Sequence, residues 1–435
     1  YGRPLEPTLK FFEDKWGKRL PDLAQANSQV LQAGHNLGDT METARNRYQV
    51  AKAPVQAGVY RKISGNEALV YGLVAAAKQS NRELLYSGYP ITPASPVLEG
   101  LSHLKKFGIK CVQAEDEIAA MGVALGASFA GDLTVCATSG PGMCLKSEFI
   151  GLASITELPL IICNVQRGGP STGLPTKTEQ SDLLQALFSR HGDCPLPVLA
   201  AHSPSDCFDC AIEAARIALT YMTPVILLSD LYVANGAEPW LVPNVSDLPV
   251  IENSFASTDE EYVIYRRNKE TLARSQAIPG QVGLEHRIGG LEKGEDGGVS
   301  YDPENHEEMS LLRAQKVAGI SKTFDPIHIQ GEAEGDLLVI GWGGTYGAIS
   351  SAVRNLRDEG FSISNIHLRH LNPLPDDLGE IMSRFKKVIV PELNLGQLNV
   401  LLRAKYLVDV ISYGKLQGKP FKVSELHEKF LEYLR

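Results

Sequence analysis

The stretch RELLYSGYPITPASP, residues 82–96, decides the fold. Its first half is a short apolar run that predicts a buried strand, and its second half carries three prolines in seven residues. Proline fixes φ and lacks an N–H donor, and it confines the preceding residue to extended geometry. The stretch therefore predicts a rigid loop at the carboxyl end of a strand, where α/β folds bind their ligands.

Further apolar runs follow along the chain. Strands are predicted in IKCVQAE, LTVCATS, LPLIICNVQ and TPVILLSD, and Ala-rich segments of helix length separate them. Ahead of the first strand, Ser64 and Glu67 have the spacing of a capping box that begins a helix. This alternation predicts an α/β fold with a doubly wound parallel sheet over residues 59–238.

The rest of the chain divides into three parts by composition. Residues 1–58 are polar and helix-prone and predict a helical tail. Residues 239–332 are rich in Pro, Gly and Asp and predict an irregular linker. Residues 333–435 contain GDLLVIGWGGTYGAI, SISNIHLRHL and KKVIVPELN, which predict the strands of a second α/β domain.

Charge and cysteine content exclude several function classes. The formal net charge is −9 and no basic block occurs, which argues against nucleic acid as a partner. No apolar run approaches the ~20 residues of a membrane span. The seven scattered cysteines indicate reduced intracellular thiols. Cys207 and Cys210 form a C-x-x-C without further ligands nearby, so we interpret them as helix thiols and predict no metal site on this chain.

Two of the motifs that follow predicted strands carry hydroxyl and carboxyl groups. In the proline loop, Thr92 and Ser95 offer hydroxyls to a substrate. The stretch QAEDEIAAMG, residues 113–122, places three acidic residues where a strand passes into a helix. A buried carboxyl there is suited to hydrogen-bond a cofactor ring, and the alternative is a solvated first turn that favours the helix dipole.

Two more motifs offer close backbone approach and a guanidinium. The Gly-Pro-Gly of TSGPGMCLK, residues 138–146, lets the backbone come near a ligand but lacks the full phosphate-loop pattern. The stretch NVQRGGPSTG, residues 164–173, holds Arg167 on a Gly-rich loop, where it either binds a carboxylate or lies on a surface turn. The Gly-rich stretch 341–347 lacks the acidic residue that a nicotinamide site requires.

In combination these motifs resemble the pyrimidine-binding domain of 2-oxoacid:ferredoxin oxidoreductases. The segments that carry this resemblance are YPITPASP, AEDEIAAMGVALGASFAG, TSGPGMCLKSE and NVQRGGPSTGLPTKTEQSDL. GLEHRIGGLEKGEDGGVSYDPENHEEM resembles the linker of the 2-oxoglutarate-type alpha subunit, and GWGGTYGAI, HLRHLNPLP and VIVPELNLGQL resemble its transketolase-like carboxyl domain. Residues 1–58 resemble the end of a gamma-type domain that is fused in front of such subunits.

The resemblance implies a thiamine diphosphate enzyme that converts 2-oxoglutarate and coenzyme A to succinyl-CoA and CO2, reversibly in principle, with electrons passed to ferredoxin. Glu117 matches the glutamate that faces the aminopyrimidine of the cofactor, with Glu115 as the alternative if the register shifts by two. Thr92 matches the threonine that reaches the substrate, and Arg167 matches the arginine that grips its carboxylate.

Further contacts are expected from the same match. Beside Glu117, the residues expected to contact the cofactor are Tyr89, Pro90, Ile91, Gly140 and Gly142. The candidates for substrate or coenzyme A, beside Thr92 and Arg167, are Ser95, Lys146, Lys177 and Arg287, and the three basic ones are alternatives for a second substrate carboxylate. Ala94 departs from the family pattern, which has Ser there.

The resemblance also implies a partner. The G-D-G motif for diphosphate and Mg²⁺ and the four-cysteine motifs for [4Fe-4S] clusters are not in this sequence, so we expect them on a beta subunit that shares the cofactor in an (alpha-beta)2 assembly in the cytoplasm. Two alternatives remain open: the same chemistry on pyruvate, a branched-chain 2-oxoacid or indolepyruvate, and a non-catalytic scaffold for an iron–sulfur partner.

Overall fold

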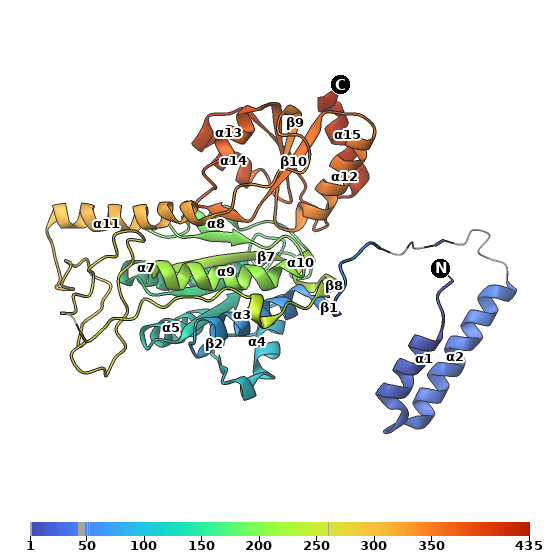
Figure 1. The fold of residues 1–435 in the computed structure, drawn as a ribbon, viewed down its shortest axis with the longest axis horizontal. Coiled ribbons are helices and arrows are strands. Elements are labelled where there is room, and N and C mark those ends of the chain that lie inside the picture. Colours follow the sequence, from blue (N-terminus) through green and yellow to red (C-terminus); the bar gives the residue numbers. More distant parts are fainter. Residues whose placement is uncertain (1, 42–47, 50, 52, 260) are drawn as a thin grey trace. The chain divides into compact units, whose positions relative to one another are not determined.

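The computed structural model describes the whole chain apart from residues 1, 42–47, 50, 52 and 260 (Figure 1). The chain separates into two compact units, Tyr1–Gly58 and Val59–Arg435. The first unit consists of helices α1 (Glu6–Phe12) and α2 (Pro21–Thr40), joined by a π-helical turn. The predicted helical tail is therefore helical up to Thr40, and residues 42–47 of that prediction lie outside the described residues.

A seven-stranded sheet organises the second unit. Its strand order is β11-β6-β7-β5-β4-β2-β3, and all neighbouring pairs are parallel except β11 with β6. Every residue of β2, β4, β5 and β7 is buried, which explains why these strands appear as continuous apolar runs in the sequence. The strands are β2 (Leu84–Gly88), β3 (Lys110–Gln113), β4 (Leu133–Thr138), β5 (Leu160–Gln166), β6 (Val198–Ala200), β7 (Pro224–Asp230) and β11 (His370–Asn372).

Helices cover both faces of this sheet, as the doubly wound pattern predicts. One core contains side chains of α3 (Gly65–Gln79), α4 (Ser95–Ser102), α9 (Asp206–Tyr221) and α10 (Leu231–Asn235). The core on the opposite face contains side chains of α5 (Glu117–Phe129), α6 (Gly140–Leu145), α7 (Ser147–Thr156) and α8 (Leu183–Phe188). The predicted capping box is confirmed, because the Ser64 N–H donates to the Glu67 carboxylate over 2.9 Å at the start of α3. Cys207 and Cys210 are both buried within α9.

A second, four-stranded parallel sheet has the order β10-β9-β12-β13. The core on the α5 face of the first sheet continues into this sheet, so the two sheets share one hydrophobic interior. The remaining face packs against α12 (Tyr346–Asp358) and α15 (Val423–Leu434). The other elements are β9 (Gly335–Trp342), β10 (Ile363–Leu368), β12 (Phe385–Glu392), β13 (Val410–Gly414), α13 (Leu378–Ser383) and α14 (Gln397–Tyr406).

The segment between the sheets departs from the irregular linker predicted for residues 239–332. Its start belongs to β8 (Ala237–Leu241), which pairs antiparallel with β1 (Tyr60–Ser64). It also contains the sixteen-residue helix α11 (Pro303–Ala318), which the sequence analysis missed. The Asp302 carboxylate caps this helix by accepting from the Glu304 N–H over 2.8 Å. Among the described residues, no helix is both long and apolar enough to cross a membrane.

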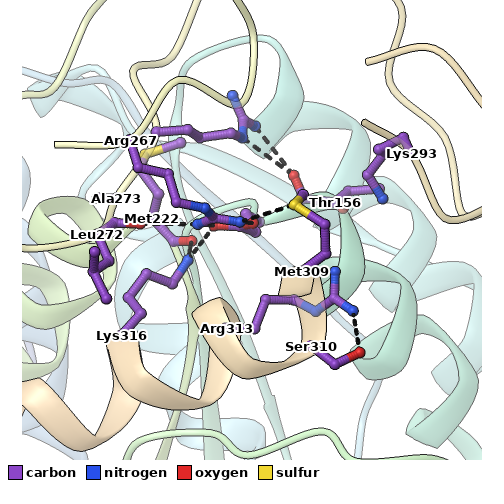
Figure 2. A network of polar contacts seen from close by, with 12 residues as sticks. Thr156, Met222, Arg267, Leu272, Ala273, Lys293, Met309, Ser310, Arg313 and Lys316 are labelled. Atoms are coloured by element: carbon purple, nitrogen blue, oxygen red, sulfur yellow. Dashed lines mark hydrogen bonds and ion pairs between the residues drawn. The ribbon is translucent and has the colours of Figure 1, made fainter. Parts of the chain in front are cut away.

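A buried ion network fastens this segment to the first sheet domain (Figure 2). Glu157, fully buried at the end of α7, accepts two hydrogen bonds of 2.6 and 2.9 Å from the Arg267 guanidinium and pairs with Lys316 of α11. Lys316 also donates to the Met222 carbonyl over 3.0 Å. Burial alone would raise the pKa of Glu157, but the two cations together lower it to about 2. This carboxylate therefore stays ionised and connects three segments.

Candidate active site

Four loops meet at one edge of the seven-stranded sheet. The strands β3, β2, β4 and β5 are adjacent and parallel, so the loops that follow their carboxyl ends emerge side by side. Each of the four strand-end motifs singled out in the sequence belongs to one of these loops. The topology therefore brings together side chains that lie up to about 75 positions apart, such as Thr92 and Arg167.

Glu117 is the acidic residue of its motif that turns inward. It is the first residue of α5, and the preceding Asp116 caps this helix by accepting from the Ala119 N–H over 2.7 Å. Glu117 is half-buried, whereas Glu115 and Asp116 are exposed. The sequence left two interpretations of this motif open, a buried carboxyl and a solvated first turn. The half-buried Glu117 agrees with the first, and the exposed Glu115 and Asp116 agree with the second.

Three side chains from three elements converge on Gly142. A Cβ atom at Gly142 would lie 2.0 Å from Thr138 Oγ1, 2.8 Å from the Tyr89 hydroxyl and 3.2 Å from Cγ of Glu117. No side chain fits there without displacing them. The Gly-Pro-Gly turn thus packs its backbone directly against the carboxyl and hydroxyl groups.

The Tyr89 hydroxyl is buried and has no hydrogen-bond partner among the described residues. Burial raises the pKa of Tyr89, and the neighbouring Glu117 carboxyl raises it further. The hydroxyl therefore remains protonated and is free to donate a hydrogen bond. Pro90 beside it is exposed, and Ile91 is half-buried.

Lys146 lies at the junction of α6 and α7 with its side chain enclosed by protein. It is 0% exposed, and its Nζ lies 4.9 Å from the centroid of the Tyr89 ring, within the range of a cation–π contact. This ammonium has no hydrogen-bond partner among the residues that the structure describes. Burial lowers the pKa of Lys146, while negative charge at Glu117 and Asp116 opposes that effect.

Arg167 joins the loop after β5 to the proline loop after β2. Its Nη1 donates to the Thr92 carbonyl over 2.6 Å, and its side chain is nearly buried, with 7% of the residue exposed. Its Nε has no partner among the described residues. On the opposite side of the loop, the Ser181 hydroxyl donates to the Arg167 carbonyl over 2.9 Å. The guanidinium is held in place with donors still available.

Ser95 serves the structure of its own loop. Its hydroxyl accepts from the Ile91 N–H over 2.9 Å and donates to the Ile91 carbonyl over 3.1 Å. The Asn66 amide braces the same loop by donating to the Pro93 carbonyl over 3.2 Å. Thr92 is exposed at the loop surface. Of the two hydroxyls predicted to meet a substrate, the Thr92 hydroxyl is the one that the loop leaves accessible.

The other two basic alternatives are exposed, and Arg287 lies far from this cluster. Lys177 is exposed on the loop that contains Arg167, and Arg287 is exposed in the linker segment. The neighbour of Arg287, His286, packs edge-on against Phe129 at the far end of α5, with ring centroids 5.5 Å apart. At ~1.5 Å per helical residue, that end lies roughly 18 Å from Glu117. Of the three basic alternatives, Lys146 is the one with a described contact to the Glu117 cluster, through the Tyr89 ring.

Sequence analysis missed a second polar pair at this edge. Asn164 Nδ2 donates to the Asp182 carboxylate over 2.9 Å, and the Asp182 N–H donates to the side chain of Gln166 over 3.0 Å. Burial raises the pKa of Asp182. Its carboxylate also lies 3.0 Å from the position of a Cβ at Gly140. No local pattern signals Asp182, because only the folded loop brings it to the Gly-Pro-Gly turn.

Several buried polar atoms at this edge of the sheet have no hydrogen-bond partner among the described residues. Buried polar groups usually have partners, so these atoms are candidates for contacts with a ligand. Within the described part of the chain, the atoms concerned are Tyr89 Oη, Ser139 Oγ, Lys146 Nζ, Asn164 Oδ1 and Arg167 Nε.

Comparison with known proteins agrees with this geometry. A family model described as "Pyruvate flavodoxin/ferredoxin oxidoreductase, thiamine diP-bdg" matches residues 76–299. The 2-oxoglutarate oxidoreductase subunit KorA of Mycobacterium tuberculosis is 51% identical over 98% of this chain, and the chain spans 65% of the length of that relative. The 2-oxoglutarate synthase subunit KorA of Archaeoglobus fulgidus is 36% identical over 77% of this chain and 88% of its own length.

Two solved structures are similar as well. A 2-oxoglutarate:ferredoxin oxidoreductase from Magnetococcus marinus, with 2-oxoglutarate, coenzyme A and succinyl-CoA bound, superposes with a TM-score of 0.94 at 34% identity over 100% of this chain and 75% of that chain. A split-gene transketolase superposes with a TM-score of 0.51 at 14% identity, which supports the fold alone. The chain belongs to the 2-oxoacid:ferredoxin oxidoreductase family, among the alpha subunits of the 2-oxoglutarate type.

Proposed function

We propose that this chain is the thiamine-pyrimidine side of an enzyme that oxidatively decarboxylates 2-oxoglutarate to succinyl-CoA, with electrons passed to ferredoxin. The observation that carries the proposal is the convergence of Glu117, Tyr89 and Thr138 on the bare backbone of Gly142. A carboxyl and two hydroxyls around a position without a side chain suit a ring that carries nitrogen acceptors and an amino group.

The residues present fit thiamine diphosphate. When bound, this cofactor supplies the nucleophilic carbon and the electron sink that decarboxylation of a 2-oxoacid requires. Glu117 would hydrogen-bond a pyrimidine nitrogen of the cofactor through a shared proton, and the neutral Tyr89 hydroxyl would donate beside it. Gly140 and Gly142 would let the ring approach the backbone.

The substrate would bind across the two loops that Arg167 joins. Arg167 uses one N–H on the Thr92 carbonyl, and its remaining donors are suited to fork onto the carboxylate next to the oxo group. The exposed Thr92 would contact the oxo side of the substrate. Both groups would hold the 2-oxoacid in the orientation that the reaction needs, which lowers the entropic part of the barrier.

The printed names of the relatives support 2-oxoglutarate over other oxoacids. We infer that a beta subunit completes the site with the diphosphate contacts, Mg²⁺ and the [4Fe-4S] cluster, in an (alpha-beta)2 assembly that works in the cytoplasm. Among the described residues, no group of three or more His, Cys, Asp or Glu side chains has the arrangement of a metal site. Ferredoxin would meet the partner that carries the cluster.

The test is anaerobic reduction of a low-potential viologen dye by this chain co-purified with its beta-type partner, with coenzyme A present. Reduction with 2-oxoglutarate that Glu117→Gln abolishes, while assembly persists, is the expected result. A preference for pyruvate would agree with the proposed reaction type and would contradict the assignment of 2-oxoglutarate as the substrate. Equal rates for wild type and Glu117→Gln would overturn the assignment of the site and favour a scaffold role.

A further inference from the structure

Lys146 is a buried cation that the proposed mechanism does not yet use. Its ammonium lies against the Tyr89 ring at 4.9 Å, is 0% exposed, and has no hydrogen-bond partner among the described residues. A buried charge without a partner costs several kcal/mol, so an enclosed lysine is retained where its charge has a use. Tyr89 and Gly142 place this charge in the immediate surroundings of Glu117.

We propose that Lys146 is a positioning residue, whose buried ammonium stabilises negative charge on the Glu117 carboxylate so that the proton shared with the bound cofactor lies on the ring. This inference rests on the proposed function and deepens it. Lys146 acts through Glu117 and touches neither substrate nor the reacting carbon.

The charged groups around Lys146 support the proposal that its ammonium acts on Glu117. The groups that interact with it are Glu117 and Asp116 of α5, Cys136 of β4 and the Tyr89 ring. Asp116 is exposed and is occupied as the helix cap, and the Cys136 thiol is kept neutral because burial raises its pKa. Glu117 is thus the acidic group on which the ammonium acts most directly inside the site.

The contacts of Lys146 favour a role at Glu117 over its other candidate role as the partner of a second substrate carboxylate. Its ammonium lies over the Tyr89 ring, and the Tyr89 hydroxyl and Glu117 both lie at the Cβ position of Gly142. The electrostatic role requires only proximity, because a charge acts through a buried, weakly polar medium.

The experiment uses the assembled alpha–beta enzyme with Lys146→Met, Lys146→Gln and Lys146→Arg. Thiamine diphosphate affinity is measured by calorimetry as a function of pH, together with kcat and KM for 2-oxoglutarate. The neutral variants remove the positive charge that lies near the Glu117 carboxylate. We therefore expect both neutral variants to shift the pH midpoint of cofactor affinity and the kcat profile upward by about one unit. At neutral pH, kcat should fall about tenfold with KM unchanged, and Lys146→Arg should restore the wild-type profile.

Lys293→Met is the matched control. Lys293 is likewise a buried lysine over a tyrosine ring, 2% exposed and 5.2 Å from the centroid of Tyr265, but it lies in the linker segment. Its removal should leave the pH midpoint in place. Wild-type midpoints in both neutral Lys146 variants would overturn the inference, as would loss of assembly in both that Lys146→Arg rescues, since the charge would then serve folding. Failure of the wild-type enzyme to bind thiamine diphosphate would instead overturn the proposed function.

Discussion

Arg167 donates a 2.6 Å hydrogen bond from Nη1 to the carbonyl oxygen of Thr92, and this contact joins loops that follow two different strands of the sheet. The guanidinium is fixed before a ligand arrives, with its Nε still without a partner among the described residues. An arginine held in this way loses little conformational freedom when a carboxylate binds, because its entropy was already lost in folding.

The first prediction follows from that contact. Arg167→Lys keeps the positive charge but loses the planar fork, so KM for 2-oxoglutarate should rise about 10- to 100-fold, the range expected for one charge-assisted hydrogen bond. Thiamine diphosphate affinity should stay the same, as measured by calorimetry on the assembled enzyme. Arg266→Lys, at an exposed linker position, is the control. An unchanged KM in Arg167→Lys would show that Arg167 does not bind the substrate carboxylate.

The second prediction concerns Gly142. A methyl group there would meet Thr138 Oγ1 at 2.0 Å and the Tyr89 hydroxyl at 2.8 Å, so Gly142→Ala must displace the side chains that are proposed to surround the cofactor ring. We expect thiamine diphosphate affinity to fall at least tenfold, with the fold retained by circular dichroism. Gly347→Ala, in α12 with nothing within 4 Å of the new Cβ, should leave affinity unchanged. If Gly142→Ala bound thiamine diphosphate with wild-type affinity, the cofactor ring would not bind next to Gly142.

The sequence was most informative where structure is local. The Ser64–Glu67 capping box and the strand-and-helix alternation depend on residues close in the chain, and both are confirmed. The resemblance to the family is confirmed as well. The three-residue strand β6 was missed because it is too short to show a pattern. The predicted second strand of the carboxyl domain breaks at Arg369, and its last part, β11, pairs with β6 of the other sheet.

Prediction of the site from the sequence was also limited by contacts between residues that lie far apart in the chain. The identity of Glu117 as the inward acid depends on helix α5, which begins at Glu117 after the cap Asp116, and a resemblance was needed to select it. Asp182 shows no local signal, since its role arises from Asn164 and Gly140 in space. Lys146 and Arg287 were equivalent as basic residues in the sequence, and only burial separates them.

The third prediction addresses the ion network of the linker. Glu157→Gln leaves the buried Lys316 and Arg267 without their shared carboxylate, and removal of one partner from a buried pair costs about 3–5 kcal/mol. Urea unfolding should show that loss. The double variant Glu157→Gln, Lys316→Met should recover part of it, because one of the two uncompensated charges is gone. Additive losses in the double variant would contradict a coupled network.

The Glu157 carboxylate also predicts a loss of folding stability at low pH. The pKa of Glu157 is about 2 in the folded protein, because Lys316 and Arg267 outweigh the effect of burial, whereas an ordinary glutamate titrates near 4.5. A lowered pKa means that the unfolded chain binds a proton first. The contribution of Glu157 is therefore complete above about pH 4.5 and is lost as the pH falls toward 2. In Glu157→Gln, the fall in unfolding free energy across this window should be smaller than in the wild type.

Lys293 predicts that the free energy of unfolding also changes with pH in the alkaline range. Burial lowers its pKa to about 8 from an ordinary 10.5, so the folded protein disfavours the charged form that the unfolded chain retains. The unfolded chain then binds more protons between these values, and the free energy of unfolding should rise with pH across that window by ~3 kcal/mol. Lys293→Met should reduce this rise by the share that Lys293 contributes, whereas Lys269→Met, at an exposed linker position, should leave it unchanged. Lys316, whose pKa is also lowered to about 8 by burial, accounts for the rise that remains, and an undiminished rise in Lys293→Met would contradict the assignment to Lys293.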